Sequence, residues 1–301
     1  MENLKEKINK LKKEKDAVIL AHNYQVSEVQ LAADHLGDSL ELSRLAAEVK
    51  NKVIVFAGVK FMAETAKILS PEKKVLLPRL DAGCPMADMI TVEELRYLKK
   101  QHPKAKVVTY VNSGVEIKAE SDACCTSSNA EKVVANIESD EVIFVPDRNL
   151  GSYVQSKVPQ KKIILFEGYC YVHNRMKTEE IEEMKKLHPD AEIVVHPEVR
   201  KELVPLAGQV LSTSGMLRYV TESDSKEFIV GTEQGLLERM KRENPGKVFL
   251  PALRPKVCQN MKRTSLEDVY MALKLDQYKI EIDKEISGKA AKSLDEMLKY
   301  I

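Results

Sequence analysis

The stretch DAVILAHNY (residues 16–24) has two counterparts later in the chain, AKVVTYVNS (105–113) and AEIVVHPEV (191–199). Each is a short apolar run, rich in β-branched residues, that ends in polar side chains, and this pattern predicts a strand rather than a helix. Because the runs do not alternate between polar and apolar residues, they are typical of buried parallel strands. The chain therefore holds three copies of one unit.

The segments after these strands repeat in the same order. Helix patterns that open with capping residues follow at 37–50, 125–138 and 211–223. Second strands come next, at 51–58, 140–147 and 226–233, and third strands at 73–78, 161–166 and 246–251. We therefore expect an α/β fold of three similar α/β/α sandwich domains with short parallel sheets, whose strand ends would meet on one side of each sheet.

Each copy closes with a cysteine in a loop beyond its third strand. Cys84, Cys170 and Cys258 are separated by 86 and 88 residues, from 84 to 170 and from 170 to 258. Three thiolates from three copies would meet at a pseudo-three-fold axis, which suits an iron-sulfur cluster with one open iron. An open iron is a Lewis acid for a substrate.

Two other interpretations of these cysteines are a buried core position and a zinc site. Their loop contexts favour a ligand role over a core role. Structural zinc usually takes closely spaced cysteine pairs, and Cys84, Cys170 and Cys258 have no such partners. Cys124 and Cys125 occur in the second copy only, and we interpret them as structural or cavity-lining.

The repeat period is longer than that of stacked repeat modules, so each copy is interpreted as a small domain. The predicted domains span 1–86, 87–175 and 176–263 around a central cluster and active site. The tail, 264–301, contains a helix, a strand-like YKIEI (278–282) and a final amphipathic helix. We expect this tail to pack on the first domain.

The charge balance disfavours nucleic-acid and membrane partners. The chain has 47 basic and 46 acidic side chains, so it has no strong net field. No apolar run reaches the length of a membrane span, and the N-terminal stretch lacks the apolar core of a signal peptide. A cytoplasmic location with reduced cysteines is expected.

Polar residues at the strand ends complete the predicted site. They are His22, Asn23 and Tyr24 in the first copy, Tyr110 and Asn112 in the second, and His196, Pro197 and Glu198 in the third. The next helix of each copy adds hydroxyls at its start: Ser39, Ser127, and Ser212 with Thr213. Singly these hydroxyls are often only caps, but converging helix N-termini also bind phosphate and carboxylates.

Several of these motifs together resemble quinolinate synthase, over about residues 16–262. The motifs are AHNYQ (21–25), GDS (37–39), YVNS (110–113), CTSSNA (125–130), PDRNLG (146–151), HPE (196–198), ST (212–213), GTE (231–233) and CQNM (258–261). The resemblance implies a 4Fe-4S cluster on the three cysteines, and condensation of iminoaspartate with dihydroxyacetone phosphate to quinolinate for NAD biosynthesis. An aspartate oxidase or aspartate dehydrogenase would supply the iminoaspartate. The chain departs from the family pattern at two places. Tyr171 and Val172 follow Cys170, where a smaller residue or Pro is expected. No second cysteine lies near Cys258, and this implies that the C-x-x-C thiol switch of some relatives is lacking.

The resemblance and the chemistry together assign roles. Tyr110, Asn112 and Ser127 would hold the carboxylates of iminoaspartate, whereas His22, Ser39, Ser212 and Thr213 would hold the triose phosphate. Glu198 beside His196 is the predicted acid/base, with Tyr24 as a second proton carrier. His173 is placed with the substrate-binding residues, and a supporting contact to the cluster is its alternative role.

Two other functions are compatible with a three-cysteine cluster. Another hydro-lyase would leave the phosphate-binding elements without a use. A non-catalytic redox sensor would expose its cluster on an interaction surface, whereas this chain surrounds its cysteines with His, Glu, Tyr and Ser at strand ends.

Overall fold

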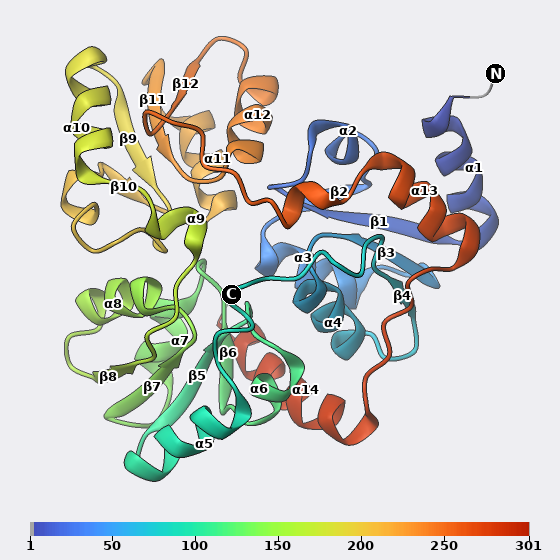
Figure 1. Cartoon of the computed structure of the whole chain (residues 1–301), viewed down its shortest axis with the longest axis horizontal. Helices are drawn as coiled ribbons and strands as arrows, with labels where there is room; N and C mark the ends of the chain where they lie inside the picture. The colour runs from blue at the N-terminus through green and yellow to red at the C-terminus, as the bar shows by residue number, and fades with distance from the viewer. Residues whose placement is uncertain (1–2, 301) are drawn as a thin grey trace.

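The computed structural model describes residues 3–300 and contains three four-stranded sheets around a common centre (Figure 1). Their strand orders are β2-β1-β3-β4, β6-β5-β7-β8 and β10-β9-β11-β12, so the three units share one topology. All the strand pairs within these sheets are parallel. The predicted fold of three similar α/β/α domains is confirmed.

The predicted strands and helices occur in the predicted order, with additional short elements between them. The first unit contains α1 (Leu4–Lys15), β1 (Ala17–His22), α2 (Ser27–Gln30), β2 (His35–Gly37), α3 (Ser39–Glu48), β3 (Val53–Ala57), α4 (Lys60–Leu69) and β4 (Lys74–Leu76). The second contains α5 (Val92–Gln101), β5 (Lys106–Tyr110), α6 (Val115–Ala119), β6 (Ala123–Cys125), α7 (Ala130–Asn136), β7 (Glu141–Val145), α8 (Arg148–Lys157) and β8 (Lys162–Leu165). After α9 (Tyr171–Asn174), the third contains α10 (Thr178–Leu187), β9 (Glu192–Val195), η1 (Val204–Leu206), β10 (Gln209–Val210), α11 (Thr213–Glu222), β11 (Glu227–Gly231), α12 (Gln234–Glu243) and β12 (Val248–Pro251). The chain ends with η2 (Met261–Arg263), α13 (Leu266–Leu275) and α14 (Lys284–Leu298).

The central strands are apolar because helices cover both of their faces. Every residue of β1 and β3 is buried, including the polar His22 at the end of β1. His22 pairs with Gly37 in the adjacent β2, directly before the start of α3. The fold therefore brings the polar end of the first strand beside the N-terminus of the next helix, and this arrangement builds the site.

Three short edge strands, β2, β6 and β10, were not predicted from the sequence. Each lies in the chain between the first strand of its unit and the helix that was predicted to follow that strand. In the second unit this changes the position of the helix: the prediction began at residue 125, but Cys125 ends β6 and α7 begins at Ala130. Ser127 consequently lies in a turn and not at the start of a helix. Strands of two or three residues are too short to produce a recognisable periodicity.

The tail contacts two units. Helix α13 contacts α1, α2 and β3 of the first unit. Helix α14 contacts α6 and β6 of the second unit and α4 of the first, and Figure 1 shows it beside the second sheet. Between them, Lys279 forms an antiparallel bridge with Leu76 of β4. The domain boundaries at 86 and 175 remain a prediction, and none of the described helices is long and apolar enough to cross a membrane.

Candidate active site

A pocket lies where the three units meet. Residues from all three units line it, together with the loops that carry the three cysteines. The predicted site residues in its lining are His22, Tyr24, Ser39, Cys84, Tyr110, Asn112, Ser127, Cys170, His173, His196, Glu198, Thr213 and Cys258. The strand ends and cysteine loops of the three copies thus converge on one cavity.

Three residues of the predicted site, Ser212, Asn23 and Pro197, do not line the pocket. The Ser212 hydroxyl accepts a hydrogen bond from Gly215 N at 3.3 Å, which makes Ser212 the N-cap of α11. The same hydroxyl donates to Asp38 Oδ2 at 3.2 Å. Ser212 therefore caps the start of α11, and Thr213 is the residue that lines the cavity.

The three cysteines are each partly buried and free of disulfides. Burial raises the pKa of the Cys84 thiol to about 12, and the backbone N–H groups of Ala87 and Met86 oppose this rise. Burial likewise raises the pKa of Cys170 and of Cys258, again opposed by backbone N–H groups in the loops that follow. The described lining contains no Lys or Arg side chain that could stabilise three thiolates.

A bound metal centre would supply the missing positive charge. All three cysteines line this pocket, and a negative charge on Cys258 would raise the pKa of Cys84, as one on Cys84 would raise that of Cys170. Backbone N–H groups aimed at the sulfurs and a partly open pocket suit thiolate ligands of iron. By contrast, Cys124 and Cys125 are fully buried in β6 away from the pocket, and Cys124 contacts Ser293 of α14. Of the two predicted alternatives, structural or cavity-lining, this position favours the structural one.

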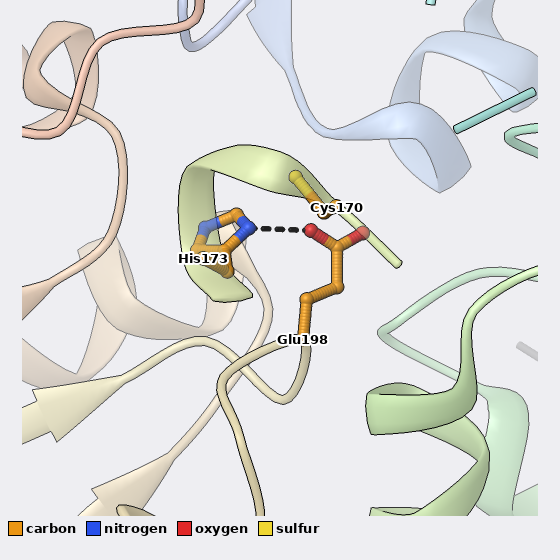
Figure 2. Close-up of side chains that lie close together, drawn as sticks. All are labelled: Cys170, His173 and Glu198. Atoms are coloured by element: carbon orange, nitrogen blue, oxygen red, sulfur yellow. Dashed lines mark ion pairs between the residues drawn. The ribbon is translucent and has the colours of Figure 1, made fainter. Parts of the chain in front are cut away.

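Glu198 lies at the centre of the polar side of the pocket. Its Oε2 atom is 2.5 Å from His173 Nδ1 and 3.6 Å from His196 Nδ1, and all three side chains are buried. Figure 2 shows His173 and Glu198 pointing toward each other, with Cys170 beside them.

The surroundings of Glu198 favour its ionised form. Burial would raise the pKa of its carboxyl, but His196, His173 and a hydrogen bond from Tyr110 act in the opposite direction and lower it. A buried carboxylate with donors on several sides can accept a proton from a bound molecule. One sulfur, nitrogen and oxygen atom of Cys170, His173 and Glu198 also lie within 4.8 Å of one another, so these groups could hold a metal ion.

His22 is the last residue of β1 and His196 directly follows β9, and both rings accept a backbone hydrogen bond in the same way. Tyr24 N donates to His22 Nδ1 at 3.1 Å, and Glu198 N donates to His196 Nδ1 at 3.3 Å. Burial lowers the pKa of His22 to about 4 and that of His196 to about 3, so both rings are neutral at pH 7. With Nδ1 accepting, the proton is on Nε2, which makes each ring a donor. His196 Nε2 lies 3.2 Å from Ser127 Oγ.

Thr232 is a candidate functional residue that was not predicted. It follows β11, is 2 % exposed, and stands behind the pocket lining. Its hydroxyl oxygen lies 2.7 Å from the hydroxyl of Tyr24 and 3.0 Å from His173 Nε2. In the sequence, Thr232 could have been recognised as a site residue from its position in the GTE motif (231–233) at the end of a strand. The contact itself joins the first unit, the third unit and the loop between the second and third, and local sequence cannot indicate such a contact.

Asp38 is the second residue that was missed. One oxygen caps α3 by accepting from Leu40 N and Glu41 N, both at 3.0 Å. The other accepts from the hydroxyl of Ser128 at 2.8 Å, as well as from Ser212. Asp38 thereby ties the first unit to the second and third at the edge of the cavity, which it also lines.

Comparisons with known proteins agree with this geometry. A family model described as quinolinate synthetase A protein matches residues 6–299. A quinolinate synthase of Caldicellulosiruptor bescii is 52% identical over 298 residues, covering 99% of this chain and 98% of the relative. Quinolinate synthases of Alkaliphilus metalliredigens (51% identical, 98% of each chain) and of Dehalococcoides mccartyi strain BAV1 (53% identical, 100% and 99%) are similar over their whole length.

Proposed function

This chain belongs to the quinolinate synthase family and makes quinolinate for NAD biosynthesis, and we propose that it does so in the central pocket, with a 4Fe-4S cluster held by Cys84, Cys170 and Cys258. The substrates we propose are iminoaspartate and dihydroxyacetone phosphate. Their condensation gives quinolinate, phosphate and two waters. An aspartate oxidase or aspartate dehydrogenase would supply the unstable imine.

One observation carries this proposal: three cysteines from three units line the same cavity as the buried Glu198 and His173. Three thiolates leave one iron of a four-iron cluster without a protein ligand. When bound, the cluster would supply a Lewis acid for a substrate oxygen. The remaining steps depend on the side chains of this chain.

We assign the iminoaspartate carboxylates to Tyr110, Asn112 and Ser127, which surround the part of the pocket contributed by the second unit. Among the described residues, Asn112 Oδ1 is buried without a hydrogen-bond partner. A buried amide oxygen without a partner costs free energy unless a ligand satisfies it. It suits the N–H of the imine, while the amide nitrogen can donate to a carboxylate.

We assign the triose phosphate to the starts of α3 and α11. Ser39 and Thr213 are the first residues of these helices and line the pocket. Free backbone N–H groups and the positive end of the helix dipole favour an anion there. His22 adds a neutral N–H donor, and Ser212 contributes by capping α11.

Proton transfer is assigned to two groups of residues. Glu198 acts as the base because its carboxylate is ionised and buried. Tyr24, Thr232 and His173 form a hydrogen-bonded chain that can deliver a proton to a leaving hydroxyl. Such a division suits a reaction that removes protons from carbon and returns them to departing oxygen atoms.

The test is an anaerobic assay. The reconstituted protein is incubated with iminoaspartate and dihydroxyacetone phosphate, and quinolinate is measured by chromatography. Formation of quinolinate with loss of activity on removal of iron supports the proposal. Quinolinate formation by iron-free protein would contradict the role given to the cluster.

A further inference from the structure

A buried carboxylate holds the backbone of one cysteine loop in the second unit. Asp147 is fully buried and is the N-cap of α8: its Oδ1 accepts from Asn149 N at 2.8 Å and from Leu150 N at 2.9 Å. Its other oxygen, Oδ2, accepts from Cys170 N at 3.1 Å. One side chain therefore fixes both the helix start and the cysteine.

The third unit repeats this arrangement with a different residue. Glu233 is fully buried and caps α12, its Oε2 accepting from Gly235 N at 2.7 Å. Its Oε1 accepts from Cys258 N at 3.1 Å. Lys262 Nζ lies 3.0 Å from Oε1, so this carboxylate also has a cationic partner.

Backbone hydrogen bonds show that these positions are equivalent in all three units. The first residue of α4, α8 and α12 donates its N–H to the carbonyl two residues before the cysteine of its own unit. The pairs are Lys60 to Ala82 at 2.8 Å, Arg148 to Gly168 at 2.9 Å and Gln234 to Lys256 at 2.8 Å. The N-cap residues that precede these donors are Val59, Asp147 and Glu233.

The first unit thus departs from the other two. Val59 has no carboxylate to offer the Cys84 loop, and its side chain makes no cap hydrogen bond to α4. Val59 instead lines the pocket, whereas Asp147 and Glu233 do not. Asp147 and Glu233 therefore contact the site through the backbone of the cysteines that they hold, and not as part of the pocket lining.

We propose that Asp147 and Glu233 are positioning residues that fix Cys170 and Cys258 for iron binding, and that the first unit lacks this device. This inference rests on the proposed cluster. Partners that orient the ligands of a metal site commonly change its affinity strongly when they are removed. A loop held at the cysteine's own N–H has less freedom to move its thiolate away, so iron should leave slowly.

The closing experiment compares two asparagine substitutions. In Asp147→Asn one carboxylate oxygen becomes an NH2 group, which leaves either the helix or Cys170 N–H without its acceptor. Asp283→Asn is the matched control, because Asp283 caps α14 through one oxygen, at 2.9 Å to Glu285 N and 3.1 Å to Ile286 N, and has no described hydrogen bond to a cysteine loop. Asp147→Glu is the rescue variant, since the third unit uses glutamate at this position.

Iron release to a chelator is measured anaerobically on the full-length, reconstituted protein, well below the unfolding temperature. Asp147→Asn should release iron roughly 10-fold faster or more, as when a hydrogen-bonding partner of a metal ligand is lost. Asp283→Asn and Asp147→Glu should stay close to the parent rate. Glu233→Gln provides the same test in the third unit if Asp147→Asn fails to fold.

Release at the parent rate in both Asp147→Asn and Glu233→Gln would overturn the inference, as would equally fast release in Asp283→Asn. A parent protein that binds no cluster would instead overturn the proposed function on which the inference rests. The parent sample therefore separates the two failures.

Discussion

Thr232 Oγ1 lies 3.0 Å from His173 Nε2, although the two residues are 59 positions apart in the sequence. The same hydroxyl is 2.7 Å from Tyr24, whose hydroxyl is 3.5 Å from His173 Nε2. Because a hydroxyl can accept one proton while donating another, Thr232 can pass a proton between Tyr24 and His173. The other ring nitrogen of His173 contacts Glu198, so the chain of polar groups reaches the proposed base.

Thr232→Val should lower turnover about tenfold while leaving substrate KM nearly unchanged. Valine keeps the shape of the side chain but removes the hydroxyl, and one hydrogen bond worth about 1.4 kcal/mol corresponds to a change of that size in rate. Thr232→Ser restores the hydroxyl and should recover most of the turnover. Steady-state kinetics on cluster-matched samples make the comparison, and equal losses in the Val and Ser variants would refute the relay.

Glu198→Gln should retain the cluster and bind both substrates, yet lose most of its turnover. The amide preserves size but cannot accept a proton, and a positioned acid/base is typically worth about 100 to 10,000 fold. Iron content and the change in the absorption spectrum on adding substrates report binding, and quinolinate formation reports turnover. Turnover near the parent value would leave His196 or Tyr24 as the proton carrier.

Ser39→Ala and Thr213→Ala should weaken the binding of dihydroxyacetone phosphate more than they slow saturated turnover. Each removes one donor to an anion at a helix start, which is worth on the order of 1 to 2 kcal/mol. The apparent affinity is obtained by titrating the triose phosphate at saturating iminoaspartate. If only turnover fell while affinity stayed intact, these hydroxyls would not be phosphate ligands.

His22 should make the folded chain less stable in mild acid. Burial lowers its pKa from 6.5 to about 4, so the unfolded chain takes up a proton below pH 6.5 that the folded chain accepts only near pH 4. Stability from this group is therefore present at pH 7 and falls as the pH decreases toward 4, by about 2 kcal/mol at pH 5. His22→Asn keeps an acceptor for Tyr24 N but removes the titration. The decrease in the urea midpoint from pH 7 to pH 5 should be smaller in His22→Asn than in the parent. An equal decrease in the two proteins would contradict the assignment.

The sequence was sufficient to predict the three repeats and the convergence of most site residues. The long buried strands β1, β5 and β9 carry their pattern locally, and polar residues at their ends must meet where parallel strands end. The edge strand β6 is too short for this, which is why Ser127 was wrongly placed at a helix start.

Contacts between residues far apart in the chain are what the sequence could not supply. Thr232 touches Tyr24 of another unit, and Asp147 reaches Cys170 across the end of its own sheet. Asp147 resembles an ordinary helix cap in sequence, since one of its oxygens does cap α8. The role of its second oxygen depends on how the cysteine loop folds back, which no local pattern encodes.

The most direct test of the central claim is the iron, sulfide and quinolinate content of anaerobically reconstituted Cys84→Ser, Cys170→Ser and Cys258→Ser, with Cys124→Ser as the control. The parent and the Cys124 variant should hold about four irons and four sulfides per chain and make quinolinate, and each of the other three should lose both the cluster and the activity. A full cluster with normal quinolinate formation in any one of those three variants would contradict the account.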